Sequence, residues 1–126
     1  MDQKPLASST LRHFHGILDA QRAEILAQQA HVAASLAEVR EARDGEQDDE
    51  HDPEGPTLTT EWSRLTGLQD DAVRQLKELD KALARIEDRT YGFCSRCGQP
   101  IARARLEARP MAELCIDCAR LAETGR

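Results

Sequence analysis

The chain has 126 residues and a formal net charge of −6 at pH 7, with 40% hydrophobic but only 3% aromatic residues. This length suits one domain, or one extended arm joined to a small module, and excludes a second large domain. Few aromatic side chains leave little bulk for a wide globular core, so a long helical shape is favoured. The negative charge argues against general electrostatic attraction to nucleic acid or anionic lipid.

The first ten residues lack the apolar core of a secretory signal, and no later run approaches the roughly 18 to 20 apolar residues of a membrane span. We therefore expect a soluble, cytoplasmic protein with no membrane partner. In the reducing cytosol, the four cysteines are better suited to metal binding than to two disulfides.

Apolar residues recur every seven positions in the first third of the chain: Leu11, Leu18, Ile25, Val32 and Val39. This stripe predicts a helix from about Thr10 to Arg43. Ser9 or Thr10 is the expected N-cap, and Gly45 supplies a stop.

A second stripe has the same spacing and consists of Leu65, Ala72, Leu79 and Ile86. It predicts another helix from about Leu58 to Thr90, with Thr57 as its cap. Neither helix can hide its stripe alone, and the connection is long enough for the chain to reverse. Residues 1–90 are therefore expected to form a helical arm, an antiparallel two-helix coiled coil.

Residues 44–56 contain seven acidic residues and no lysine or arginine. Two glycines and two prolines in the same stretch predict an exposed tip between the helices. Taken alone, such a charge run is most simply a solvated loop. At the end of a stiff arm, its carboxylates can instead be delivered to metal ions or basic side chains in a narrow channel.

The helical pattern ends before Tyr91, and residues 91–126 are expected to form a zinc module with a short final helix near Met111 to Ala122. Two CxxC pairs with seventeen residues between them supply four candidate ligands: Cys94, Cys97, Cys115 and Cys118. This spacing is typical of tetrahedral zinc sites. Gly98 can adopt the positive φ that often follows such a turn, and the second pair is expected on or beside a helix start.

Four thiolates would close the coordination sphere, so we expect one structural Zn²⁺ and no enzymatic activity. Two alternatives remain open: reduced, buried cysteines, and a redox CxxC, which would need a βαβ context. Three histidines, His13, His15 and His31, are interpreted as solvated side chains. Phe14 and Trp62 are interpreted as packing residues.

Arginines surround the cysteines, and acidic residues are interspersed among them: Arg96, Arg103, Arg105 and Arg109, with Glu107, Glu113 and Asp117. The arginines leave a nucleic-acid-binding zinc module as an alternative function. A structural coiled-coil adaptor that associates through its apolar seam is a further alternative.

The sequence resembles the DksA/TraR family of bacterial transcription regulators, which join a coiled-coil arm to a four-cysteine zinc finger. The resemblance lies in these segments: Tyr91-Gly92-Phe93-Cys94, Cys97-Gly98, Pro100-Ile101, Arg105-Leu106-Glu107-Ala108-Arg109-Pro110 and Leu114-Cys115-Ile116-Asp117-Cys118-Ala119. It implies a monomeric, non-enzymatic regulator that binds RNA polymerase and reads no DNA sequence directly.

In this family the arm enters the secondary channel of the polymerase, and acidic residues at its tip approach the catalytic Mg²⁺. Longer members carry Asp-x-x-Asp-x-Ala at this tip. Here Asp49 and Asp52 match the two aspartates, whereas Glu54 stands where alanine is expected. The resemblance therefore assigns the action on the polymerase to Asp49 and Asp52.

Some longer members also hold the alarmone guanosine tetraphosphate with basic residues. Of these basic residues, this sequence matches only Arg109. Asp71, Glu78 and Ala119 stand at the other positions where basic residues are expected. The carboxylates of Asp71 and Glu78 would repel a polyphosphate. A weak or absent alarmone response is therefore predicted.

Overall fold

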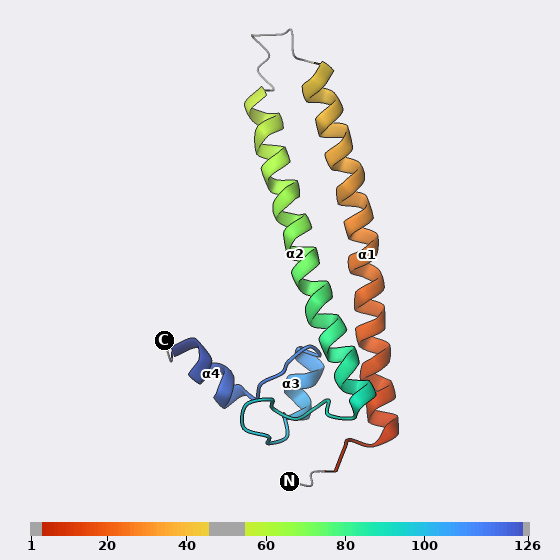
Figure 1. Cartoon of the computed structure of the whole chain (residues 1–126), viewed down its shortest axis with the longest axis vertical. Helices are drawn as coiled ribbons and strands as arrows, with labels where there is room; N and C mark the ends of the chain where they lie inside the picture. The colour runs from red at the N-terminus through yellow and green to blue at the C-terminus, as the bar shows by residue number, and fades with distance from the viewer. Residues whose placement is uncertain (1–3, 46–54, 125–126) are drawn as a thin grey trace. The chain divides into compact units, whose positions relative to one another are not determined.

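The computed structural model describes residues 4–45 and 55–124. These residues form four helices: α1 (Ser8–Gly45), α2 (Gly55–Asp88), α3 (Arg103–Ala108) and α4 (Ile116–Thr124) (Figure 1). The predicted fold class, mainly α-helical with two long antiparallel helices and a four-cysteine module, is confirmed. None of the helices in the described ranges is both long and apolar enough to cross a membrane.

The first helix is longer than predicted at both ends. It begins at Ser8 rather than Thr10, and the backbone N–H of Leu11 donates to the Ala7 carbonyl at 2.9 Å. Neither Ser9 nor Thr10 therefore precedes the helix as its N-cap, so that prediction was wrong. Gly45 ends α1, as its weak helix propensity predicted.

The second helix begins and ends earlier than predicted. It starts at Gly55 instead of Leu58, so Thr57 lies inside the first turn and is not the cap. Pro56 is compatible with this start, because a proline in the first turn forfeits no helical hydrogen bond. The helix ends at Asp88 rather than Thr90, since Arg89 adopts a left-handed backbone conformation with φ of 65°.

The chain forms two compact units. The base unit comprises Met1–Arg22 and Lys77–Arg126, and the hairpin unit comprises Ala23–Leu76. Within each unit, α1 and α2 run side by side in opposite directions (Figure 1). The predicted domain boundary between residues 90 and 91 follows the change in sequence pattern and stays a prediction. The base unit differs from it, because this unit groups parts of both long helices with the cysteine module.

The core of the hairpin unit follows the predicted stripes. Its buried cluster consists of Val32, Leu36, Val39 and Leu65, and the partly buried Leu58, Trp62 and Leu68 pack against it. Trp62 is thus a packing residue, as predicted. The guanidinium carbons of Arg40 and Arg43 lie 5.7 and 6.0 Å from the centre of its ring system.

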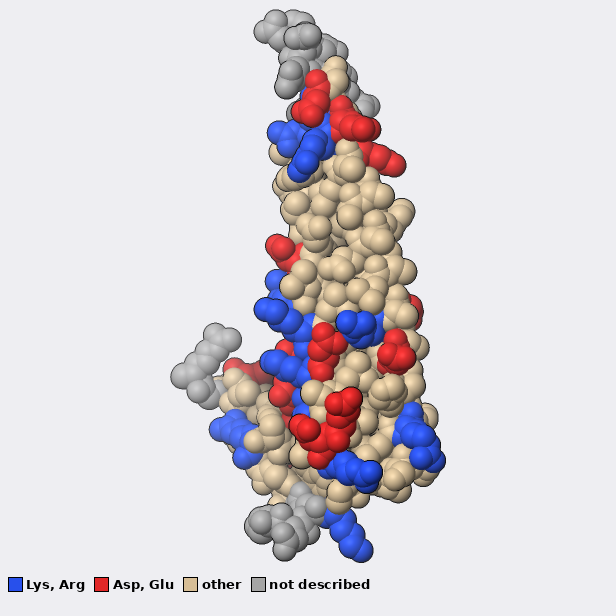
Figure 2. All heavy atoms as spheres, turned by 45° about the vertical axis from the view of Figure 1, so that its right-hand side comes forward, with Lys and Arg blue, Asp and Glu red and all other residues tan. Residues whose placement is uncertain are grey.

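The surface of the hairpin unit carries a long uncharged area. Residues 25–37 of α1 contain no Asp, Glu, Lys or Arg, and Leu26 and Val73 are the large hydrophobic residues exposed in this unit. Figure 2 shows the resulting uncharged surface.

The core of the base unit joins the long helices to the cysteine module. Leu18 and Leu79, from the two heptad stripes, are both fully buried. Phe14 is also fully buried, with its ring centre 5.4 Å from that of Tyr91. The seam of the helical pair therefore continues into the module through an aromatic contact.

Candidate metal centre

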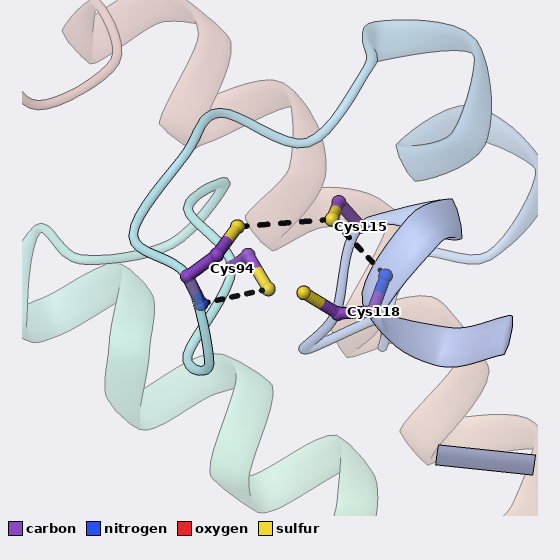
Figure 3. A group of neighbouring side chains, drawn as sticks. Cys94, Cys115 and Cys118 are labelled. Carbon is purple, nitrogen blue, oxygen red and sulfur yellow. Dashed lines mark hydrogen bonds between the residues drawn. The ribbon is translucent and has the colours of Figure 1, made fainter. Parts of the chain in front are cut away.

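The four cysteines predicted as ligands come together. One ligand sulfur from each of Cys94, Cys97, Cys115 and Cys118 lies within 4.8 Å of the other three. Figure 3 shows the sulfurs of the labelled Cys94, Cys115 and Cys118 turned toward one another. The closest hydrogen-bonding contact between sulfurs joins Cys97 and Cys115 at 3.8 Å. This cluster has the composition and compactness needed to hold a single metal ion.

A tight turn brings the first cysteine pair together. The turn is closed by an isolated antiparallel bridge between Phe93 and Pro100, and the backbone N–H of Cys94 donates to the Gln99 carbonyl at 2.8 Å. Gly98 adopts a φ of +78°, as predicted. The backbone N–H groups of Arg96 and Cys97 point at the Cys94 sulfur at 3.4 and 3.5 Å.

A helix start positions the second pair. Cys115 immediately precedes α4, and the buried Cys118 lies in its first turn. The N–H of Cys118 donates to the Cys115 sulfur at 3.5 Å. The expected position beside a helix start is confirmed, but the helix begins at Ile116 and not at Met111.

Two arginines hold the segment before this helix in a non-helical path. Arg85 of α2 donates to the carbonyl oxygens of Met111 and Ala112, at 3.4 Å each. Arg105 of α3 donates through Nε to the Leu114 carbonyl at 2.9 Å. These bonds satisfy carbonyl groups outside the helix, which accounts for its late start. Neither contact was predicted, because arginines in an acidic chain give no sequence signal for backbone carbonyls.

Tyr91 connects the end of α2 to the same segment. Its hydroxyl donates to the Pro110 carbonyl at 2.7 Å. Burial raises the pKa of Tyr91 to about 12, since the charged phenolate would lose its hydration. Between the two cysteine pairs, the N–H of Ser95 donates to the Glu113 carbonyl at 2.8 Å. The pairs are thus connected by protein hydrogen bonds as well as by any shared ion.

Gly92 lies beside Leu6 of the segment before α1. Its φ is +95°, and an added Cβ would lie 2.6 Å from Cδ1 of Leu6. Its carbonyl accepts a hydrogen bond from the N–H of Ile101 at 2.8 Å. The positive φ therefore favours glycine at this position, and a Cβ here would also require the Leu6 side chain to shift.

The cluster distributes charge unequally among its sulfurs. Burial opposes ionisation of Cys94, but hydrogen bonds from the backbone of Cys97, Cys115 and Arg96 outweigh it and lower the pKa of the Cys94 thiol to about 6. Burial raises the pKa of Cys118 to about 12, and contacts with the other cysteines add to the rise. Several thiolates close together repel one another, and a bound dication would offset this repulsion by neutralising their charge.

One histidine has a partner that the sequence analysis missed. Nε2 of His13 lies 3.1 Å from a carboxylate oxygen of Glu107, and Nε of Arg103 donates to the same oxygen at 3.1 Å. The hydrogen bond with His13, followed by that with Arg103, holds the pKa of Glu107 below its usual value. His13 is exposed, as predicted, but it also connects α1 to α3 across 94 residues of sequence.

The residues assigned by the family resemblance lie in different places. Arg109 is exposed directly after α3 and lines a pocket of about 300 Å³. Asp71 forms an ion pair with Arg74 and Glu78 with Lys81, while Ala119 lies in α4. Three tip residues, Asp49, Asp52 and Glu54, lie outside the described residues.

Comparisons with known proteins agree with this geometry. The family model for the prokaryotic dksA/traR C4-type zinc finger matches residues 89–123. The RNA polymerase-binding transcription factor DksA of Haemophilus influenzae is 30% identical over 123 residues, which cover 97% of this chain and 80% of that protein. Since the finger match coincides with the four clustered cysteines, the cofactor is one structural Zn²⁺, as predicted.

A second relative matches over a shorter range. The RNA polymerase-binding transcription factor DksA of Escherichia coli strain K12 is 44% identical over 63 residues, or 50% of this chain. The match spans only 42% of that relative's length. Among solved structures, transcription factor DksA2 from Pseudomonas aeruginosa has a TM-score of 0.79 at 24% identity, covering 93% of this chain and 85% of that one. It shows the same fold.

Proposed function

Because the chain belongs to the DksA/TraR family, we propose that it is a transcription regulator that binds RNA polymerase. The observation that carries this proposal is the 30% identity to Haemophilus influenzae DksA over 97% of the chain. That relative is named for polymerase binding, and the match extends through both long helices as well as the finger. The proposed site of action is the cytoplasm, where the polymerase works.

The zinc finger serves this function as a scaffold. Cys94, Cys97, Cys115 and Cys118 are the proposed ligands, and four thiolates leave no coordination position for water or substrate. The protein therefore acts by binding and not by catalysing a reaction. Its effect on transcription requires groups elsewhere in the chain.

The proposed acting groups are Asp49 and Asp52 in the acidic segment between α1 and α2. Inserted into the secondary channel, their carboxylates would interact with the catalytic Mg²⁺ or with basic side chains around it. Support for this assignment comes from their match to the two aspartates of the family's tip motif.

The test separates binding from action. Replacing both residues (Asp49→Ala and Asp52→Ala) should leave pull-down of core RNA polymerase largely intact and abolish the effect on transcription in a purified assay. Cross-linking from position 49 should reach the active centre of the polymerase. A double variant at exposed acidic positions of the hairpin unit, Glu24→Ala with Asp70→Ala, is the matched control and should retain the effect.

An unchanged transcription effect in the tip variant would exclude Asp49 and Asp52 as the acting groups. Failure of the unaltered chain to retain polymerase would contradict the function itself. Adding guanosine tetraphosphate to the same assay should change the result little, because Asp71 and Glu78 are acidic and Ala119 is uncharged. A strong alarmone effect would contradict that part of the proposal.

A further inference from the structure

A second pocket lies in the base unit, away from the cysteines, where α1 begins and α2 ends. Its volume is about 460 Å³, within the range that small-molecule sites occupy in proteins. Ser8, Leu11, Arg12 and His15 line it from the first two turns of α1. Ile86, Glu87 and Arg89 line it from the end of α2.

The two arginines of this pocket, Arg12 and Arg89, form no ion pair within the described part of the chain. The other arginines of the base unit that enter ion pairs are Arg22, Arg85 and Arg103, which pair with Asp80, Glu113 and Glu107. With Glu87 as the single carboxylate of the lining, the pocket has excess positive charge.

Arg89 occupies a position whose backbone conformation favours glycine. Its φ is +65°, and the N–H groups of Thr90 and Tyr91 both donate to the Arg85 carbonyl, at 2.9 and 3.1 Å. Helices that end in this way usually carry glycine at the left-handed position. A long cationic side chain at such a position is consistent with a role in binding and not in stabilising the fold.

The rest of the lining favours an anion attached to a larger molecule. Leu11 is buried and Ile86 partly buried, so the pocket has an apolar part beside its two arginines. The first turn of α1 adds the positive end of a helix dipole, and Ser8 supplies a hydroxyl. Two guanidinium groups with a histidine suit the several oxygens of a phosphoryl group better than a single carboxylate.

We propose that this pocket binds a small phosphate-bearing molecule through Arg12 and Arg89, with the apolar part contacting the remainder of the ligand. The site is distinct from the pocket that Arg109 lines. It does not depend on polymerase binding, so it can be tested on the isolated, zinc-loaded chain.

The test is a titration of the full chain with inorganic phosphate, pyrophosphate and ATP at constant ionic strength, followed by backbone amide NMR. Pyrophosphate or ATP should shift signals of residues 8–15 and 86–89 more than sodium chloride does. A tighter response to ATP than to pyrophosphate would support contact between the apolar part and the remainder of the ligand, and equal responses would overturn that part of the proposal.

Two variants and one control make the result specific. Arg12→Ala and Arg89→Gly should each weaken binding at least tenfold, and both should fold, since Arg12 is exposed and glycine suits the backbone at position 89. Arg120→Ala removes an exposed arginine of the same unit and should leave binding unchanged. The proposal is overturned by shifts no larger than those with chloride, or by equal weakening in Arg120→Ala.

Discussion

The base unit and the hairpin unit are stabilised in different ways. The hairpin unit has a regular core in which Val32, Leu36, Val39 and Leu65 follow the heptad pattern. In the base unit, much of the chain is irregular and is positioned by individual hydrogen bonds, such as those of Tyr91 and Arg105, and by four sulfurs. Apolar packing is spread over many equivalent contacts, whereas directional bonds and metal ligands are few and each matters more.

Removing zinc should produce the largest difference in stability between the two units. Metal binding in small modules contributes on the order of 10 kcal/mol to folding. Treatment with a chelator under reducing conditions should therefore unfold residues 91–122, because little apolar core remains there without the ion. Hydrogen exchange measured by mass spectrometry should show protection lost in this range and kept around Val32 and Leu65.

Two outcomes would contradict that expectation. Equal loss of protection in both units would show that the hairpin unit also depends on the metal. Unchanged protection together with no zinc in the purified protein would show that the fold does not require the metal. Protection restored by adding zinc back is the control for chelator effects.

Shortening one buried leucine in each unit should produce a smaller difference in the free energy of unfolding. Leu79→Ala in the base unit should cost about 3 to 5 kcal/mol, because the side chain is fully buried. Leu65→Ala in the hairpin unit should cost about 2 to 3 kcal/mol, since a helical pair can close around the cavity. Urea unfolding followed by circular dichroism measures both.

The exposed Leu26 provides the matched control. Its side chain is 40% exposed, so Leu26→Ala should change the free energy of unfolding by less than about 1 kcal/mol. A cost for Leu65→Ala above that for Leu79→Ala would contradict the expectation that the cavity at Leu79 closes less readily than the one at Leu65.

Among the buried positions, removing the Tyr91 hydroxyl should have the smallest effect. Tyr91→Phe deletes one buried hydrogen bond and should cost about 1 kcal/mol at neutral pH. In the folded state burial raises the pKa of Tyr91 to about 12, above the ordinary value of 10. This contribution is therefore complete below pH 10 and is lost as the pH rises through 12.

The measurement is the difference in stability between the parent chain and Tyr91→Phe across this range of pH. The difference should shrink from pH 10 to pH 12 as the parent loses the contribution of its tyrosine. A difference that stays constant would show that the folded state does not hold the phenol in its neutral form.

The sequence predicted the long helices well because their pattern repeats over many turns. Five apolar residues at a spacing of seven identified α1, and the finger spacing identified all four sulfurs that meet. The ends of the helices were less predictable, since they depend on single residues. Pro56 in the first turn of α2 was a usable signal that Thr57 is not a cap, and Arg89 ends that helix against its own conformational preference.

The missed parts of the site depend on contacts between distant residues. Helix α3 has six residues, too few to show a periodic pattern. The contact of His13 with Glu107 joins residues 94 positions apart, and spacing along one helix could not reveal it. The carbonyl groups bound by Arg85 and Arg105 are likewise invisible in the sequence, because every residue carries one.

Leu6 covers Gly92 so closely that the few residues ahead of α1 matter for engineering the protein. A truncation that starts the chain at Ser8 would delete Leu6 and expose the turn that leads into Cys94. Purification tags are therefore better attached after Thr124, where the last helix ends, than fused directly in front of Leu6.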